Sequence, residues 1–531
     1  MQLHFNTVRT AWIQFVAWLI VQPARPVSEL APVVTASTQD APVVAPQPPP
    51  ARALLERPCL SQLSLWDEAA LPPFVRHCEV ARKYLRLLGP LDWAHFPERD
   101  PHHPWPGPQP QPRAPYVAAF LVKLEEQKRY MSDLREFLVE HPALVWVLGF
   151  PLVPSDQFPW GFDVKASLSC ARHFGRVLRT LPNDAAQFLL DGTVKQLQAA
   201  LPSACACATG EAISLDTKHI IAWVKENNPK AYLRDRYDKT KQPKGDPDCR
   251  LGCKRKRNRA PDVAAAPETP PPTPTTNPVP ARSAEVGEFY WGYASGVVAT
   301  KVPDWGEFVL AEFTQPFDQS DDSYFFPLLK ATERRLGRRP KFGALDAAYD
   351  AFYVYEYFHN AGGFAAVPLA ERGGFKGRLF DETGRPLCKA GLAMPLKLTF
   401  RCKTSLIEHE MGRWACPLFF PQPTGQPCPG DDAHWAKGGC VTAMATSIGA
   451  RIRYQLDRDS DAFKTVYQQR TADERINSQA KELGIERPML RNGRAIANLN
   501  SLIYVLINLR ALHRVRAQRE AQTQEAPVTQ S

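Results

Sequence analysis

The sequence has no long uninterrupted apolar run. Its strongest one, AWIQFVAWLIV at 11–21, is interrupted by Gln14 and is shorter than the roughly 20 residues that span a bilayer. No small-x-small cleavage pattern follows it, which argues against a secretory signal. Its apolar residues recur at helical spacing and predict a short helix. We therefore expect a cytoplasmic protein with no membrane partner.

A dense framework of cysteines is also missing. The twelve cysteines are spread from Cys59 to Cys440, whereas a disulfide framework packs them into a short chain. This spread favours reduced thiols in a cytoplasm. Residues 388–440 hold five cysteines and two histidines but no CxxC pair, so free thiols are favoured over a structural zinc ion there. These residues are Cys388, Cys402, His409, Cys416, Cys428, His434 and Cys440.

Methionine is scarce, with six residues, whereas proline is abundant, with 51. This composition predicts long irregular connections between folded parts. We expect a flexible proline-rich N-terminus with a short helix at 1–58, a disordered linker at 260–285 and a disordered tail at 516–531.

Helical periodicity dominates residues 59–205, with patterns near 74–89, 116–140, 163–181 and 184–200. Short turns separate the patterns, which predicts an all-helical block. Such a block is a common scaffold for a DNA-binding domain of the helix-turn-helix kind. A purely structural helical subdomain is the alternative interpretation.

From Gly210 the pattern changes to strands. EAISLDTKHII alternates like a strand, and EFYWGYASGVVATK and EFVLAEFTQP follow after a detour at 222–286. A helix, the strand KFGAL, a second helix and the strand FAAVPLA come next. The order is strand, strand, strand, helix, strand, helix, strand. This order predicts a mixed α+β fold of the ribonuclease H-like kind, in which a mixed sheet is flanked by helices.

The predicted catalytic core has two parts. Its sheet occupies 210–374, and helices at 461–515 complete it. Between them, residues 375–460 are predicted to form a β-rich insertion. We therefore expect an all-helical N-terminal block followed by a ribonuclease H-like core with an inserted subdomain.

Two aspartates lie where this fold places acidic residues. Asp216 is in the first strand and Asp346 ends the fourth, and these two strands are neighbours in the sheet. Asp350 competes with Asp346, but it suits the N-terminal charge of the next helix. His219, on the same strand as Asp216, is interpreted as a packing residue or as a residue that supports the ligands, rather than as a ligand itself.

A third acid, Glu474, lies in YQQRTADERINSQAK at 467–481. At about 100° per residue, one narrow helical stripe contains Tyr467, Arg470, Glu474 and Lys481. In such a stripe the carboxylate can bind a metal ion, and the cations on either side of it can bind a phosphate. The alternative is a capping box, with Thr471 as N-cap and Glu474 reaching back to it. Asp473 and Glu482 are the competing acids.

The spacing Tyr-x2-Arg-x3-Glu-x6-Lys, together with LDTKHIIAWV around Asp216 and ALDAAYD around Asp346, resembles DDE transposases of bacterial insertion sequences. These are the transposases with the YREK signature, and the resemblance covers about 210–515. It implies an enzyme that binds insertion-sequence ends and catalyses DNA cleavage and strand transfer. It also implies a homodimer on transposon and target DNA, in the bacterial nucleoid.

The resemblance further implies a metal site with two divalent ions, Mg²⁺ or Mn²⁺. Asp216 would bridge the ions, with Asp346 on one and Glu474 on the other. Carboxylate oxygens are the ligands that Mg²⁺ prefers. The DNA contacts that it implies are Tyr467, Arg470 and Lys481.

The overall charge fits a polyanionic partner. The chain has 65 Lys and Arg against 55 Asp and Glu, a net charge of +10. The cluster KRKRNR at 254–259 is either a solvated run or a contact to the DNA backbone; its first four residues are Lys254, Arg255, Lys256 and Arg257. Two other functions fit the same residues. One is an inactive or regulatory DNA-binding derivative, and the other is a nuclease without strand transfer.

Overall fold

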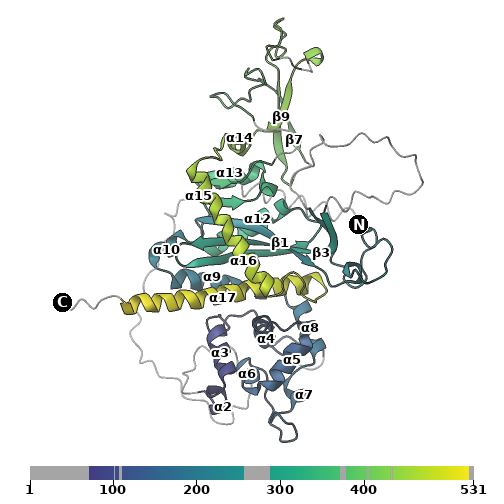
Figure 1. Cartoon of the computed structure of the whole chain (residues 1–531), viewed down its shortest axis with the longest axis vertical. Helices are drawn as coiled ribbons and strands as arrows, with labels where there is room; N and C mark the ends of the chain where they lie inside the picture. Colours follow the sequence, from purple (N-terminus) through teal and green to yellow (C-terminus); the bar gives the residue numbers. More distant parts are fainter. Residues whose placement is uncertain are drawn as a thin grey trace, which may run out of the picture.

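The structure is a computed structural model, and it describes residues 71–100, 102–106, 110–255, 287–370, 378–403, 406–430, 432 and 435–525. The predictions for 1–58 and for the linker 260–285 lie outside the described residues. Along the long axis of the molecule, a helical block, a long helix, a central sheet and a small outlying sheet follow one another (Figure 1).

The central sheet is mixed and lies at the middle of the protein. Its strands run in the order β2-β3-β1-β5-β6, and β4 also pairs with β3. β1 is antiparallel to β3 and parallel to β5. The bounds are β1 (Ala212–Ile221), β2 (Arg250–Arg255), β3 (Gly287–Val302), β4 (Gly306–Pro316), β5 (Phe342–Leu345) and β6 (Phe364–Ala366). A mixed sheet flanked by helices is thereby confirmed.

β2 is the strand that the sequence did not predict. It lies within the stretch 222–286, which was expected to be a detour. β3 extends beyond the end of β1, and β2 pairs with this extension, so that Gly252 lies opposite Tyr290. Leu251 is buried, which gives the pairing an apolar anchor.

Both faces of the sheet are buried, which explains why β3 is apolar at nearly every position. Val297 and Ala299 face a core shared with α16 and α17. Ala294 and Val298 face the opposite core, made with α12 and α13. The bounds of these and of the short helices between them are η7 (Asp321–Tyr324), α12 (Phe325–Leu336), η8 (Ala347–Tyr349), α13 (Phe352–Asn360), α15 (Asp461–Tyr467), η10 (Gln468–Arg470), α16 (Thr471–Glu482) and α17 (Gly493–Glu525).

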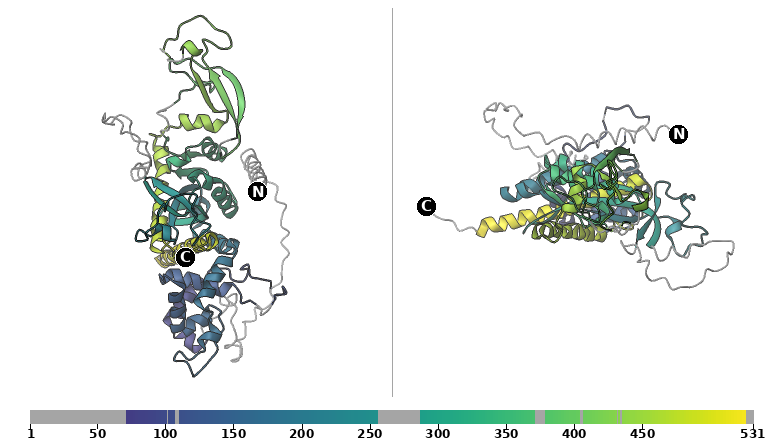
Figure 2. Two further views of the ribbon diagram at one scale, coloured as in Figure 1. Left: turned by 90° about the vertical axis from the view of Figure 1, so that its right-hand side faces the viewer. Right: turned by 90° about the horizontal axis from the view of Figure 1, so that it is seen from above.

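The helix α17 lies between the sheet and the helices of residues 73–180 (Figures 1 and 2). Apolar side chains on all of its sides are buried, from Ile496 to Leu512, as expected for a helix with partners all round. In the described part of the chain, it is the one helix long and apolar enough to span a membrane, but 89% of its most apolar window is buried inside the protein. It therefore serves as a core helix.

The prediction of a disordered tail at 516–531 is wrong for its first part, because the helix α17 continues to Glu525. Its later turns are held against the body of the protein. Val515 is buried with Trp305 and Leu201, and the Arg519 Nη1 atom donates to the Ala200 carbonyl at 3.0 Å. Tertiary packing thus extends a helix that composition alone did not support.

The N-terminal block is helical in its described part, as predicted. The pattern at 116–140 is two helices rather than one, because Gln127 has φ of 50° and Tyr130 begins a new capped helix with Asp133. The helices are α2 (Pro73–Arg76), α3 (Glu79–Leu88), α4 (Ala114–Glu125), α5 (Met131–Glu140), α6 (Pro142–Val147), α7 (Val164–Ser167), α8 (Ala171–Thr180), α9 (Asn183–Ala200) and α10 (Ser203–Ala208).

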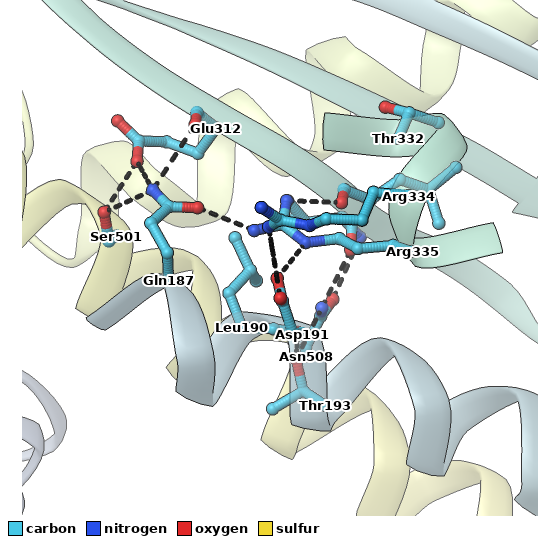
Figure 3. A network of polar contacts seen from close by, with 12 residues as sticks. Gln187, Leu190, Asp191, Thr193, Glu312, Thr332, Arg334, Arg335, Ser501 and Asn508 are labelled. Atoms are coloured by element: carbon cyan, nitrogen blue, oxygen red, sulfur yellow. Dashed lines mark hydrogen bonds and ion pairs between the residues drawn. The ribbon is translucent and has the colours of Figure 1, made fainter. Parts of the chain in front are cut away.

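A buried polar network joins the block to the core (Figure 3). Gln187 and Asp191 come from α9, Arg335 from α12, Glu312 from β4 and Ser501 from α17. The Gln187 amide donates to Glu312 at 2.9 Å, and the Ser501 hydroxyl donates to it at 2.7 Å. Arg335 donates to Gln187 at 2.6 Å and pairs with Asp191. The helix α9 is therefore tied to the sheet as well as to the block.

The insertion is β-rich, as predicted. Its strands β7 (Leu396–Cys402), β8 (His409–Ala415) and β9 (Val441–Ala445) form an antiparallel sheet in the order β7-β8-β9. The short helix η9 (Trp435–Lys437) precedes β9, and α14 (Ile448–Gln455) follows it and packs on α13. In Figure 1 this sheet lies at the opposite end of the molecule from the helical block.

Candidate active site

Asp216 and Asp346 lie side by side in the central sheet. β1 and β5 are parallel, with Leu215 opposite Leu345, so the two aspartates take the next pair of positions. β5 ends at Leu345, and the Asp346 carboxylate then accepts a hydrogen bond from the Ala348 N–H at 2.9 Å. The sequence thus predicted the positions of both acids correctly.

Strand alternation directs Asp216 toward α16. Leu215 and Ile213 point into the core with α12 and α13, so Asp216 points to the opposite face. There its carboxylate accepts a hydrogen bond from the Asn477 amide of α16 at 3.0 Å. Asn477 was not identified from the sequence, although it lies three residues after Glu474, on the same helical face.

Glu474 lies in the first turn of α16, which continues from α15 through η10. The capping-box alternative is wrong, because no side chain caps this helix and the Thr471 hydroxyl donates to the Gln468 carbonyl at 2.9 Å. Glu474 is exposed and free to meet a ligand.

The charges of these acids act on one another. Burial raises the pKa of Asp216, and the Asp346 and Glu474 carboxylates raise it further. A backbone hydrogen bond from Thr217 and the Arg470 guanidinium oppose this shift. Carboxylates that destabilise one another in this way favour a bound cation.

Arg470 is the cation of this cluster. Its Nη1 atom donates to the Tyr467 hydroxyl at 3.2 Å. Burial lowers the pKa of Arg470, but the Tyr467 hydrogen bond and the Asp216 and Asp346 charges outweigh this and raise it. Three of the four signature residues, namely Tyr467, Arg470 and Glu474, are therefore gathered at the acids.

Lys481 lies further along α16. Its ammonium is 3.9 Å from Glu486, which also pairs with Lys218 at 2.7 Å. Lys218 is on the same face of β1 as Asp216, two residues on. The fourth signature residue thus lies on the face of the site but not among its acids.

Asp350, the rival of Asp346, has a structural role. Its buried carboxylate accepts a hydrogen bond from Arg453 Nε at 2.7 Å, another from the Tyr355 hydroxyl at 2.8 Å and a third from the Ala370 N–H at 2.8 Å. These donors use the oxygens that a metal would need. Asp346 is therefore the better candidate for catalysis.

The two other candidate acids of this helix, Asp473 and Glu482, lie in environments that differ from that of Glu474. Asp473 is fully buried, and burial first and the Asp216 charge second raise its pKa well above the usual range. Neither of its carboxylate oxygens has a hydrogen-bond partner at normal geometry in the described residues. Glu482 is exposed at the far end of α16. Glu474 alone combines exposure with proximity to Asp216.

Asp321 is a fourth acid at the site, and sequence reasoning missed it. The Thr217 hydroxyl donates to its carboxylate at 2.8 Å. Burial raises the pKa of Asp321 to about 6, and the Asp346 and Asp216 charges contribute. It lies in η7, at the start of a stretch with helical spacing. Nothing in that spacing marks Asp321 as a site residue, so only the fold brings it here.

The donor set matches the chemistry of a hard divalent cation. Asp216, Asp346 and Glu474 offer oxygen ligands of the kind that Mg²⁺ prefers, and their repulsion would be offset by positive charge. In the described part of the chain, no three acidic, histidine or cysteine side chains lie close enough together to hold a metal ion as they stand. The site therefore fits such an ion in the chemistry of its donors.

The other residues that were predicted to contact DNA or to bind zinc are not part of this group of acids. Lys254 and Arg255 are on β2, while Lys256, Arg257 and His434 lie outside the described residues. Cys416 follows Ala415 and Cys440 precedes Val441, and these two neighbours pair in the insertion sheet. Burial, with Cys416 and Cys388 nearby, raises the pKa of Cys440 to about 12. A zinc ion among them stays an untested prediction.

His219 is a packing residue, as predicted. Its ring lies 4.5 Å from that of Phe317. Burial lowers its pKa to about 4, and the Lys254 and Lys218 charges add to this shift. The ring is therefore neutral at pH 7 and is surrounded by aromatic side chains.

No protein-family model matches the chain, and no curated protein is significantly similar to it.

Proposed function

We propose that this protein is a DNA transposase of the DDE kind, which cuts the ends of an insertion sequence and joins them to target DNA. The observation that carries the proposal is the position of Asp216 and Asp346 at neighbouring places on adjacent parallel strands, with Glu474 and Arg470 near enough for their charges to act on Asp216. The strand order around them agrees with a ribonuclease H-like core. In this proposal the partner is DNA, the protein acts as a dimer, and it works in the cytoplasm.

The acids would act through metal. Asp216, Asp346 and Glu474 would hold two Mg²⁺ or Mn²⁺ ions, which stabilise the attacking and leaving oxygens of a phosphodiester. Asn477 keeps Asp216 on the α16 face through its 3.0 Å hydrogen bond. Asp321, beside Thr217, adds negative charge at the same edge.

The cations would hold the DNA. Arg470 keeps one guanidinium nitrogen on Tyr467 and has other N–H groups for a phosphate. Lys481 is 64% exposed, and its separation of 3.9 Å from Glu486 is a weak pairing that a phosphate can replace. The two cations would therefore contact the strand on either side of Glu474 along the helix.

The test begins with the DNA that flanks the gene, where inverted repeats should mark the ends of the element. A duplex that contains one repeat should be cut at its end in the presence of Mg²⁺, and a precut end should be joined to plasmid DNA. Cleavage without joining would indicate a nuclease. Binding without either reaction would indicate a regulatory derivative.

Arg470→Gln and Lys481→Gln are expected to weaken binding to element ends. Each should also reduce the slope of log affinity against log salt by about one unit, because each removes one phosphate contact. Fluorescence anisotropy over a salt series measures both effects. An unchanged slope would mean that the cation serves the helix rather than the DNA.

A further inference from the structure

A second cationic surface lies outside the candidate active site. A groove of about 430 Å³ opens where the loop between α4 and α5, the segment after β1 and the link between α16 and α17 meet. Four cations line it, and no acidic side chain does. They are Arg129, Lys225, Arg487 and Arg491. We name this surface the phosphate groove.

Arg491 is held in place by Trp223. The guanidinium lies 4.8 Å from the centre of the Trp223 ring, and its Nε atom donates to the Trp223 carbonyl at 3.2 Å. Trp223 is itself 44% exposed, which is unusual for so large a ring. The stacking fixes the plane of the guanidinium and leaves its two terminal nitrogens available for an oxyanion.

Arg129 is held in the same way from the other side. Its guanidinium lies 5.6 Å from the centre of the Tyr130 ring, and Nη2 contacts the Met489 sulfur at 3.7 Å. The Tyr130 and Trp223 rings lie 6.3 Å apart. Two oriented guanidinium groups therefore face one groove, each supported by an aromatic ring.

Lys225 and Arg487 add positive charge without such support. Both are exposed, and no ion pair in the described part of the chain engages any of the four cations. Glu486, the acid nearest to them on the link, is already paired with Lys218. Four cations without neutralising acids make an electropositive surface that suits an external anion, and arginine forks match phosphate geometry.

We propose that the phosphate groove binds the backbone of duplex DNA outside the cleavage site. The inference rests on the proposed function for the identity of the DNA. Ile221, the last residue of β1, lines the groove and lies five residues after Asp216, so at about 3.3 Å per residue the groove begins roughly 17 Å beyond it. That distance corresponds to about five base pairs of B-DNA, so one duplex can reach both sites.

The experiment measures the salt dependence of binding to the inverted-repeat duplex and to a duplex of unrelated sequence. Arg129→Gln with Arg491→Gln should reduce the slope by about two units. Lys225→Gln with Arg487→Gln should do the same without disturbing an aromatic contact, which guards against misfolding of the first variant.

The matched control is Lys195→Gln with Arg514→Gln. Both of these cations are exposed, the change in net charge is the same, and Arg514 lies roughly 30 Å along α17 from the groove. The control should keep the wild-type slope. An equal loss in the control and the groove variants would overturn the inference.

The outcomes separate this inference from the proposed function. If the wild type cuts element ends but the groove variants keep its slope, the groove inference fails and the transposase proposal stands. If the wild type binds duplexes without cutting and the groove variants reduce the slope, the groove stands and the transposase proposal fails. A wild type that binds no DNA contradicts both.

Discussion

Asp216→Asn is expected to reduce the rate of DNA cleavage by about a thousandfold or more. A loss of this size is typical when a major electrostatic stabiliser of a transition state is removed. The substitution keeps the size of the side chain but removes the charge that would hold metal. Binding to element ends should be nearly unchanged, because affinity for DNA comes mainly from cations at phosphates. Cleavage of a labelled duplex and its binding are measured on the same preparation.

Asp346→Asn and Glu474→Gln should behave like Asp216→Asn. The control is Glu482→Gln, which removes an exposed carboxylate from the other end of α16 and should leave cleavage intact. Any of the three site variants that cuts DNA at the wild-type rate would remove its residue from the site. Equal loss in the Glu482 control would point to the net charge of the helix instead.

Asp350→Ala is expected to destabilise the protein by about 3–5 kcal/mol, the cost of leaving one partner of a buried ion pair alone. Arg453, Tyr355 and the Ala370 N–H would all lose their acceptor. Asp346→Ala, four residues earlier, should change stability by only about 1 kcal/mol or less. Urea unfolding of both variants separates a structural acid from a catalytic one.

The pH dependence provides a second readout. Burial alone would raise the pKa of Asp350, but hydrogen bonds and charge from Arg453 outweigh it and hold the pKa below its usual value. Stability from this group is therefore complete above the unfolded pKa of about 3.9 and is lost as pH falls through the lower folded value. The wild-type and Asp350→Ala stabilities should converge under acid. A constant difference would show that the carboxylate charge is not the stabilising feature.

Much of the core could be predicted because its signals are local. Strand alternation and helical spacing identified five strands of the central sheet, and the end of β5 identified Asp346. The strand β2 was missed because its pairing depends on the length of β3, and no local pattern reveals that. Periodicity across 116–140 hid the break between α4 and α5, which a single residue with positive φ creates at Gln127.

The candidate site was predictable only in part, for a related reason. Asp216, Glu474 and Arg470 belong to motifs whose spacing can be read directly. Asp321 and Asn477 reach the site only because the sheet and α16 bring them there. The sequence favoured Asp346 over Asp350, but the pairing of Asp350 with Arg453 could not be predicted, since Arg453 is remote in sequence from it.

The position of α17 has a consequence for how the chain acquires its structure. The helix follows every other described element in the sequence, yet it forms one wall of the N-terminal block and one wall of the sheet layer. During synthesis, the early helices therefore emerge with an uncovered apolar side and must wait for a partner more than 300 residues later. Contacts between residues so far apart in the sequence slow folding. They also lengthen the time for which apolar surfaces are exposed to solvent. Newly made chains should depend on chaperones until α17 has left the ribosome.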